Sequence, residues 1–208
     1  MNYKRLFASV ISASLVLVLQ GEAFAKGFSY TYVDASYRGI RADSIDADGV
    51  DFDLSYGATD HVMVLLGYSR LFQDTAAGLK KVDVDIDEFR MGGGGHYSFG
   101  DRFDLVGSVV YVNSKSSGDA LFPGDTSTSR VNGTNEGYEA VVSGRIQALD
   151  KLELTPMVLY KDVGDFSGVG GGFDAIYNFH KKWSVRGNYT YFSEDSTSDF
   201  FLGVRLDL

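Results

Sequence analysis

The segment WSVRGNYTY, residues 183–191, decides the fold class of this chain. Large apolar residues occupy alternate positions, at Trp183, Val185, Tyr189 and Tyr191, and polar residues stand between them. On a helix these residues would be scattered around the whole circumference, whereas a strand sorts them onto two opposite faces. The segment is therefore predicted to be a strand with one apolar and one polar face.

The same period of two recurs in VDFDLSY (50–56), YEAVVSGRI (138–146) and FFLGVRLDL (200–208). Short polar turns, each followed by an apolar residue, join such strands into hairpins; they span 58–61, 98–102, 147–151 and 180–182. Longer polar segments separate the hairpins; they span 39–49, 73–84, 114–136, 163–167 and 193–199. With a first strand near 28–38 and a last strand near 199–208, the repeat predicts ten strands.

These strands have the properties of a membrane barrel. A tilted strand of ~9–11 residues crosses a bilayer, and short turns on one side with long loops on the other are typical of bacterial outer-membrane barrels. A soluble β-sandwich would also alternate, but it would not require aromatic girdles at two interfaces. The expected outer girdle is Tyr37, Tyr68, Tyr111, Tyr138, Tyr160 and Tyr191, and the inner girdle is Tyr56, Tyr97, Phe103, Phe179 and Trp183.

The fold prediction is therefore an all-β, antiparallel, up-and-down transmembrane β-barrel with short periplasmic turns and longer extracellular loops. Ten strands are expected, and eight are the alternative. Residues 1–25 have a basic start, an apolar run and a small-residue site at Ala23 to Ala25, which predicts a cleaved signal peptide. Residues 26–208 are then one barrel domain located in the cell outer membrane.

Composition excludes several classes of function. The formal net charge is −9, which argues against nucleic-acid binding because that requires a basic face. The chain has no Cys, so it has neither a disulfide framework nor a thiolate metal site. The three histidines, His61, His96 and His180, fall at or next to the short turns, away from the outer loops where a surface enzyme would act. No catalytic activity and no cofactor are expected.

The sequence resembles the small outer-membrane β-barrel proteins of Gram-negative bacteria, the OmpA/OmpX-like barrel superfamily. The resemblance covers the whole mature chain and is carried most specifically by GFSYTYVDASYRG (27–39) and FFLGVRLDL (200–208). The second segment is similar to the terminal strand that the barrel assembly machinery recognises, although it ends in Leu208 where Phe is usual. The resemblance implies contact with outer-membrane lipids and lipopolysaccharide, and a role among adhesins, surface-defence proteins and small pores.

The inward strand faces carry many charges, and buried charges need partners. We expect an ion-pair network across a narrow lumen. Its candidate residues are Glu88, Arg90, Glu139, Arg145, Asp174, Arg186 and Arg205. Such a network is consistent with a filled, rigid interior or with a thin polar pore.

Apolar residues are also expected to point into the lumen, where they either fill it or line a pocket for a hydrophobic molecule. They are Met63, Leu65, Val106, Val110, Val112, Met157 and Leu159. The two glycine runs, 92–95 and 170–172, do not fit phosphate loops, because more strand rather than a helix follows each of them. They are expected to be points where the barrel wall bends.

Two further segments were considered as sites. DSIDADGVDFD (43–53) resembles a calcium loop, but Ser44 and Ser55 stand where acidic ligands are required, so Asp46, Asp48 and Asp51 are only a weak metal candidate. The loop 114–137 is the longest, and Phe122, Arg130 and Asn132 are its candidate contacts for a host or cell-surface partner. The expected function is a monomeric structural or surface-interaction protein in envelope integrity, adhesion or biofilm, with a narrow conduit for ions or hydrophobic molecules as the alternative.

Overall fold

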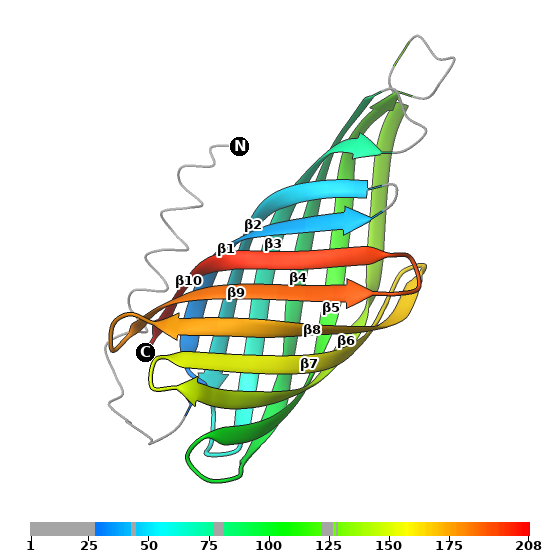
Figure 1. Cartoon of the computed structure of the whole chain (residues 1–208). Coiled ribbons are helices and arrows are strands. Elements are labelled where there is room, and N and C mark those ends of the chain that lie inside the picture. The colour runs from blue at the N-terminus through cyan, green and yellow to red at the C-terminus, as the bar shows by residue number, and fades with distance from the viewer. Residues whose placement is uncertain (1–27, 43–44, 77–80, 122–126, 128) are drawn as a thin grey trace.

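A computed structural model shows a closed barrel of ten antiparallel strands, in which each strand pairs with its neighbours in sequence and the last pairs with the first (Figure 1). The structure describes residues 28–42, 45–76, 81–121, 127 and 129–208, so the signal peptide expected at 1–25 lies outside the described residues. The strands are β1 (Tyr32–Ala42), β2 (Ile45–Gly57), β3 (Val62–Ala76), β4 (Lys81–Ser98), β5 (Phe103–Leu121), β6 (Ser129–Leu149), β7 (Leu152–Val163), β8 (Phe166–Asn178), β9 (Trp183–Phe192) and β10 (Thr197–Asp207).

The prediction of ten up-and-down strands is confirmed, and the eight-strand alternative is wrong. The four tight turns also lie where the alternation places them, between β2 and β3, β4 and β5, β6 and β7, and β8 and β9. We call this end of the barrel the turn end. Within the described residues, no helix is long and apolar enough to cross a membrane.

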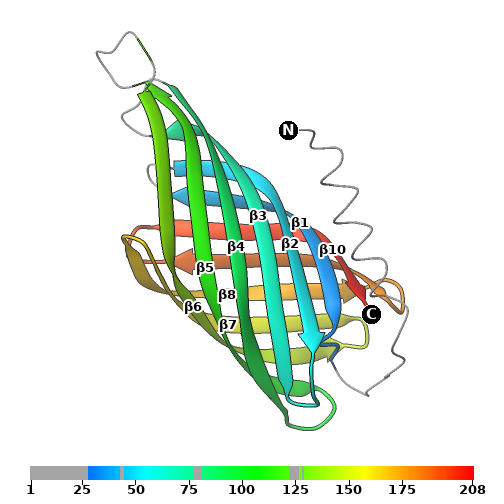
Figure 2. The ribbon, with the colours of Figure 1, turned by 180° about the vertical axis from the view of Figure 1, so that it is seen from behind.

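The opposite end differs from the sequence prediction. Strands β4, β5 and β6 are 18, 19 and 21 residues long: β5 and β6 continue through most of the segment expected as a loop at 114–136, and β3 and β4 together cover 73–76 and 81–84 of the one expected at 73–84. These strands rise beyond their neighbours as a one-sided wall, which we call the projecting wall (Figures 1 and 2). In β5 and β6 the ladder hydrogen bonds continue there without apolar alternation, because in water neither strand face has to be apolar. In β4 the alternation persists, with Val82, Val84 and Ile86 between three aspartates, in a segment that was expected to be partly loop.

The lipid-facing side carries a continuous apolar surface between two aromatic girdles. At the outer girdle, Tyr37 is 47% exposed and its ring centroid lies 6.1 Å from that of Phe200. The rings of Tyr138 and Tyr160 lie 5.8 Å apart in the same girdle. Exposed Val, Leu and Met side chains fill the surface below them, including the 50%-exposed Met91. A soluble protein rarely exposes so large an apolar patch, so this belt fits a bilayer.

Both glycine runs lie inside strands, in β4 and β8, as expected of bends in the wall. A Cβ on Gly92 would lie 2.1 Å from the carbonyl oxygen of Val109 on β5. A Cβ on Gly170 would lie 2.9 Å from the ring of inward-facing Phe192. The absent side chains thus permit close approach of neighbouring backbone in one case and of a large lumen ring in the other.

Replacing Gly92 with Ala is expected to lower the free energy of unfolding by roughly 1–3 kcal/mol, because the new methyl group overlaps the β5 backbone. Gly107→Ala is the matched control, since nothing lies within 4 Å of a Cβ at Gly107. Urea unfolding in phospholipid vesicles, followed by the fluorescence of the single tryptophan, Trp183, measures both. Equal stability of the two variants would contradict the close approach.

Candidate functional site: the charged lumen

A buried cluster of charges ties four strands together inside the barrel. Arg38 on β1 is almost fully buried and forms ion pairs of 2.7 Å with both Glu88 on β4 and Asp199 on β10. Arg90 on β4 lies 2.6 Å from Asp51 on β2 and 2.8 Å from Glu88. We call this group the central cluster. Bonds of this kind cross the lumen and hold its walls at fixed separations.

Two small residues on β3 make room for the central cluster. The Ser69 hydroxyl accepts hydrogen bonds of 2.8 Å from both Arg38 and Arg90, and donates one to Asp51. A Cβ on Gly67 would lie 2.7 Å from Nε of Arg90 and 2.6 Å from Oδ1 of Asp53. Any larger residue at position 67 would therefore displace the guanidinium from its carboxylates.

A second group connects β1, β8 and β9. The guanidinium of Arg186 lies 2.7 Å from Oδ2 of Asp34 and 2.7 Å from Oδ2 of Asp174. The other oxygen of each carboxylate, Oδ1, is buried and has no hydrogen-bond partner among the described residues. One base therefore serves two acids, which leaves this group short of positive charge and of donors.

The chain's first described residues close the turn end of the barrel. The Ser29 carbonyl accepts hydrogen bonds from Arg145 at 3.0 Å and from Arg205 at 2.9 Å. The Tyr30 hydroxyl donates to Asp104 at 2.6 Å, and its ring stacks on His96 with centroids 3.6 Å apart. The expected first strand at 28–38 therefore begins later, at Tyr32, because residues 28–31 turn into the barrel mouth.

Arg145 and Arg205 also have acidic partners at this mouth. Arg145 donates two hydrogen bonds to the Glu153 carboxylate: from Nε to Oε1 at 2.6 Å and from Nη2 to Oε2 at 3.0 Å. Arg205 lies 3.0 Å from Asp207, and its guanidinium carbon lies 3.5 Å from the ring centroid of Tyr32. The two arginines thus fasten the amino-terminal segment to β6 and β10.

The structure connects most of the predicted network through Asp53, which lies 2.9 Å from Arg90 and 3.9 Å from Arg186, and places two of its arginines elsewhere. Glu88 and Arg90 belong to the central cluster, Asp174 pairs with Arg186, and Arg145 and Arg205 lie at the mouth. Glu139 joins none of these arginines: its nearest basic atom is Nζ of Lys161, at 4.0 Å.

Across the described strands, ten carboxyl groups and six bases face the lumen. The acids are Asp34, Asp51, Asp53, Glu88, Asp104, Glu139, Glu153, Asp174, Asp199 and Asp207, and the bases are Arg38, Arg90, Arg145, Lys161, Arg186 and Arg205.

Sequence reasoning missed Arg38, Asp51 and Asp199 as network residues. Arg38 and Asp199 stood at the ends of the expected first and last strands, where the apolar alternation fades. Asp51 had a usable signal, because it lies two residues from Asp53 and so shares its face. That spacing should have placed it in the lumen rather than in a metal loop.

The weak metal candidate does not assemble. Asp48 lies on the outer face, where it accepts a hydrogen bond from Tyr37 at 2.6 Å and pairs with Arg41 at 2.7 Å. Asp46 lies 3.7 Å from the same arginine, whereas Asp51 is inside the barrel. Among the described residues, no group of three or more His, Cys, Asp or Glu side chains could hold a metal ion.

The residues expected to contact a surface partner fall on the projecting wall. Arg130 and Asn132 lie on the outer part of β6 and are exposed. Phe122 lies outside the described residues. His61, His96 and His180 all lie near the turn end, as expected, and the rings of His61 and His96 are 6.1 Å apart.

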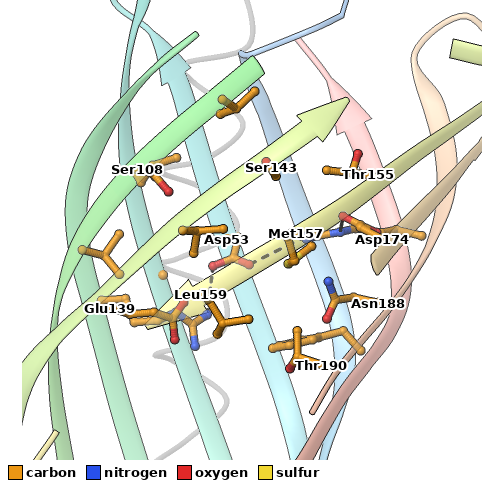
Figure 3. Close-up of a pocket in the computed structure, with 18 of the residues that line it drawn as sticks. Asp53, Ser108, Glu139, Ser143, Thr155, Met157, Leu159, Asp174, Asn188 and Thr190 are labelled. Carbon is orange, nitrogen blue, oxygen red and sulfur yellow. Dashed lines mark hydrogen bonds and ion pairs between the residues drawn. The ribbon is translucent and has the colours of Figure 1, made fainter. Parts of the chain in front are cut away.

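A cavity of about 270 Å³ lies inside the barrel and is lined by both apolar and charged side chains. Figure 3 shows Met157 and Leu159 among the polar side chains of Asp53, Asp174 and Asn188. The expected inward apolar residues Met63, Leu65, Val106, Val110, Met157 and Leu159 all line this cavity. Val112 is also fully buried.

No protein-family model matches the sequence, and no curated protein matches it. Among solved structures, the translocator domain of the autotransporter NalP from Neisseria meningitidis is similar over 99% of this chain and 98% of its own, with a TM-score of 0.53 and 11% identity. The β domain of the Bordetella autotransporter Brka matches 87% of this chain and 100% of its own, with a TM-score of 0.50 and 11% identity. The outer membrane protein OprG from Pseudomonas aeruginosa covers 87% of this chain and 97% of its own, with a TM-score of 0.49 and 9% identity. These similarities concern the fold alone, which is that of an outer-membrane β-barrel.

Replacing Arg90 with Gln should lower the free energy of unfolding by about 3–5 kcal/mol, because buried Asp51 and Glu88 lose a charge partner. Arg70→Gln is the control: Arg70 pairs with Asp85 on the exposed outer face, where an ion pair is worth at most about 1 kcal/mol. Urea titration of both proteins in vesicles gives the comparison. A small loss for Arg90→Gln would mean that the central cluster does not stabilise the barrel.

Proposed function

We propose that this outer-membrane barrel acts at the cell surface as an interaction protein, through the projecting wall, and is not an open pore. The observation that carries the proposal is the length of β4, β5 and β6, which exceeds that of the other strands. As in bacterial outer-membrane barrels, the turn end would face the periplasm, and the carboxyl end of β10 would lie on the same side. The wall would then stand above the outer leaflet.

The surface of the wall fits a role in water rather than in lipid. Above the outer girdle its outward positions are occupied by polar groups, such as Asp87 and the hydrogen-bonded pair Asn113 and Glu136. Paired strands hold these groups in a fixed arrangement at lower entropy cost than a loose loop. A rigid polar face of this kind supports adhesion to a host or neighbouring cell surface, with Arg130 and Asn132 among its contacts.

The arrangement of the lumen supports the proposal that the barrel is not an open pore. The central cluster spans the lumen between β10 and β4 near the level of the outer girdle, since Arg38 directly follows Tyr37, and residues 28–31 occupy the mouth at the turn end. An ion would have to separate buried pairs to pass, which is costly in a low-dielectric interior. The rival function, a narrow conduit, would require these groups to move.

Other contacts follow from the location. Lipopolysaccharide would pack against the outer girdle, and the barrel assembly machinery would recognise β10, which closes the barrel against β1. With a closed sheet and lipid on all sides, the protein is expected to function as a monomer.

In a planar lipid bilayer, the purified full-length protein should give no steady open-channel current. Arg186→Glu, which places a third acid beside Asp34 and Asp174, should not create an ion-selective current either, as long as the mouth stays closed. A steady wild-type conductance whose ion selectivity changes in Arg186→Glu would establish the conduit and overturn the proposal.

Deleting residues 117–132 would leave Ser116 and Gly133, which are cross-strand partners, as a tight turn above an intact barrel. Bacteria with this variant should adhere to host cells and abiotic surfaces severalfold less than bacteria with the wild type. A chain in which a Gly/Ser sequence of equal length replaces 117–132 separates the effect of surface chemistry from that of length. Unchanged adherence at equal amounts of heat-modifiable barrel would refute the surface role.

A further inference from the structure

We propose that the lumen cavity is a binding site for a small primary ammonium ion with an apolar body. Asp174 and Asn188 would receive the ammonium group, and the apolar side chains beside them would receive the carbon chain. Three features of the described residues lead to this ligand class: the local shortage of bases, the unpaired hydrogen-bonding atoms and the apolar part of the cavity lining.

The charge balance beside Arg186 calls for a cation. The cavity lining as a whole carries six carboxyl groups and six bases, so the shortage is local: Arg186 pairs with both Asp34 and Asp174, and no other ion pair among the described residues reaches either acid. Glu139 has only a distant partner in Lys161, which also lies 3.8 Å from Glu88. Buried carboxylates without full compensation are unfavourable, so a cationic guest would be stabilised beside them.

The unpaired atoms call for a hydrogen-bond donor. Oδ1 of Asp174 and Oδ1 of Asn188 are buried without a hydrogen-bond partner among the described residues, and both side chains line the cavity. The two residues are only 6% and 8% exposed. They are direct cross-strand partners on β8 and β9, so their side chains lie next to each other on the same face (Figure 3). Both atoms are acceptors, and an ammonium N–H supplies what they lack.

The apolar side chains on the neighbouring strand β7 decide between an organic ion and a bare one. Met157 and Leu159 on β7, with Val110 and Val141 beside them, present hydrocarbon to the same space. A metal ion would leave that surface unused, and no suitable group of three ligands exists among the described residues. An alkyl chain would cover the surface and gain the free energy of apolar burial.

The cavity volume limits the size of the guest. At about 270 Å³ it is slightly smaller than the pockets that hold drug-sized ligands, which begin near ~300 Å³. A chain of about four or five carbons with one charged end matches this space. A quaternary ammonium has no N–H and would leave Asp174 and Asn188 unpaired, so a primary amine should bind better.

Methionine methyl groups offer a direct test with n-butylammonium. Met63 and Met157 line the cavity, whereas Met91 faces lipid, so ¹³C-methyl labelling provides two reporters and one internal control. In detergent micelles, n-butylammonium should shift the Met157 and Met63 signals saturably and leave Met91 in place. n-Butanol, butyrate and tetramethylammonium should give at least tenfold weaker binding. The probe is added both to folded protein and during refolding, so slow entry does not affect the outcome.

Two variants and a control complete the test. Asp174→Asn keeps the shape and removes the charge, and Leu159→Phe fills the cavity without touching the acids; each should weaken binding at least tenfold. Asp101→Asn, in the exposed β4–β5 turn, should bind like the wild type. If Asp174→Asn fails to fold, Leu159→Phe still decides. Absence of binding, equal shifts with n-butanol, equal shifts of Met91, or full binding by Leu159→Phe would each overturn the proposal.

Discussion

Inside a bilayer every backbone N–H and C=O must find its partner within the protein, and the rest of this structure depends on that constraint. The ten strands meet it because β10 pairs with β1 along ten residue positions and leaves no edge. Closure then divides all side chains into a lipid-facing set and a lumen-facing set. The aromatic girdles, the apolar belt and the charged interior are consequences of that division.

The interior solves a second problem, which is the cost of burying charge. Arginine suits this task because its fork of five donors can serve several carboxylates at once. Arg38 binds acids from β4 and β10, and Arg186 binds acids from β1 and β8. The Arg38–Glu88 pair joins β1 to β4 and the Arg186–Asp34 pair joins β9 to β1, and the sheet alone connects these strands only around the circumference. Rigidity across the lumen therefore comes from side chains, and rigidity along the wall comes from the backbone ladder.

The same arrangement has consequences for function. A lumen crossed by ion pairs and closed at the turn end by residues 28–31 favours activity outside the barrel, on the projecting wall. Arg186 has to serve two acids, and a cavity lined partly by apolar side chains adjoins that place. A surface role and a small-molecule site in the lumen can therefore exist in one barrel without an open channel.

Local pattern was sufficient for the strand type, the strand number and the four tight turns, because the two-residue period arises within each strand and is visible in segments such as 183–191. The alternation also identified which residues face inward, including Met157 and Arg186. It did not identify the partners, because register and barrel closure bring together residues such as Arg38 and Asp199, 161 positions apart. Nor did it identify the projecting wall, since β5 and β6 need no apolar face in water and leave no periodic trace there, and the alternation that β4 keeps at 82–87 does not show how far the strand pairs. Sequence settled what each strand presents to its two sides; closure of the sheet settled which side chains meet in the middle.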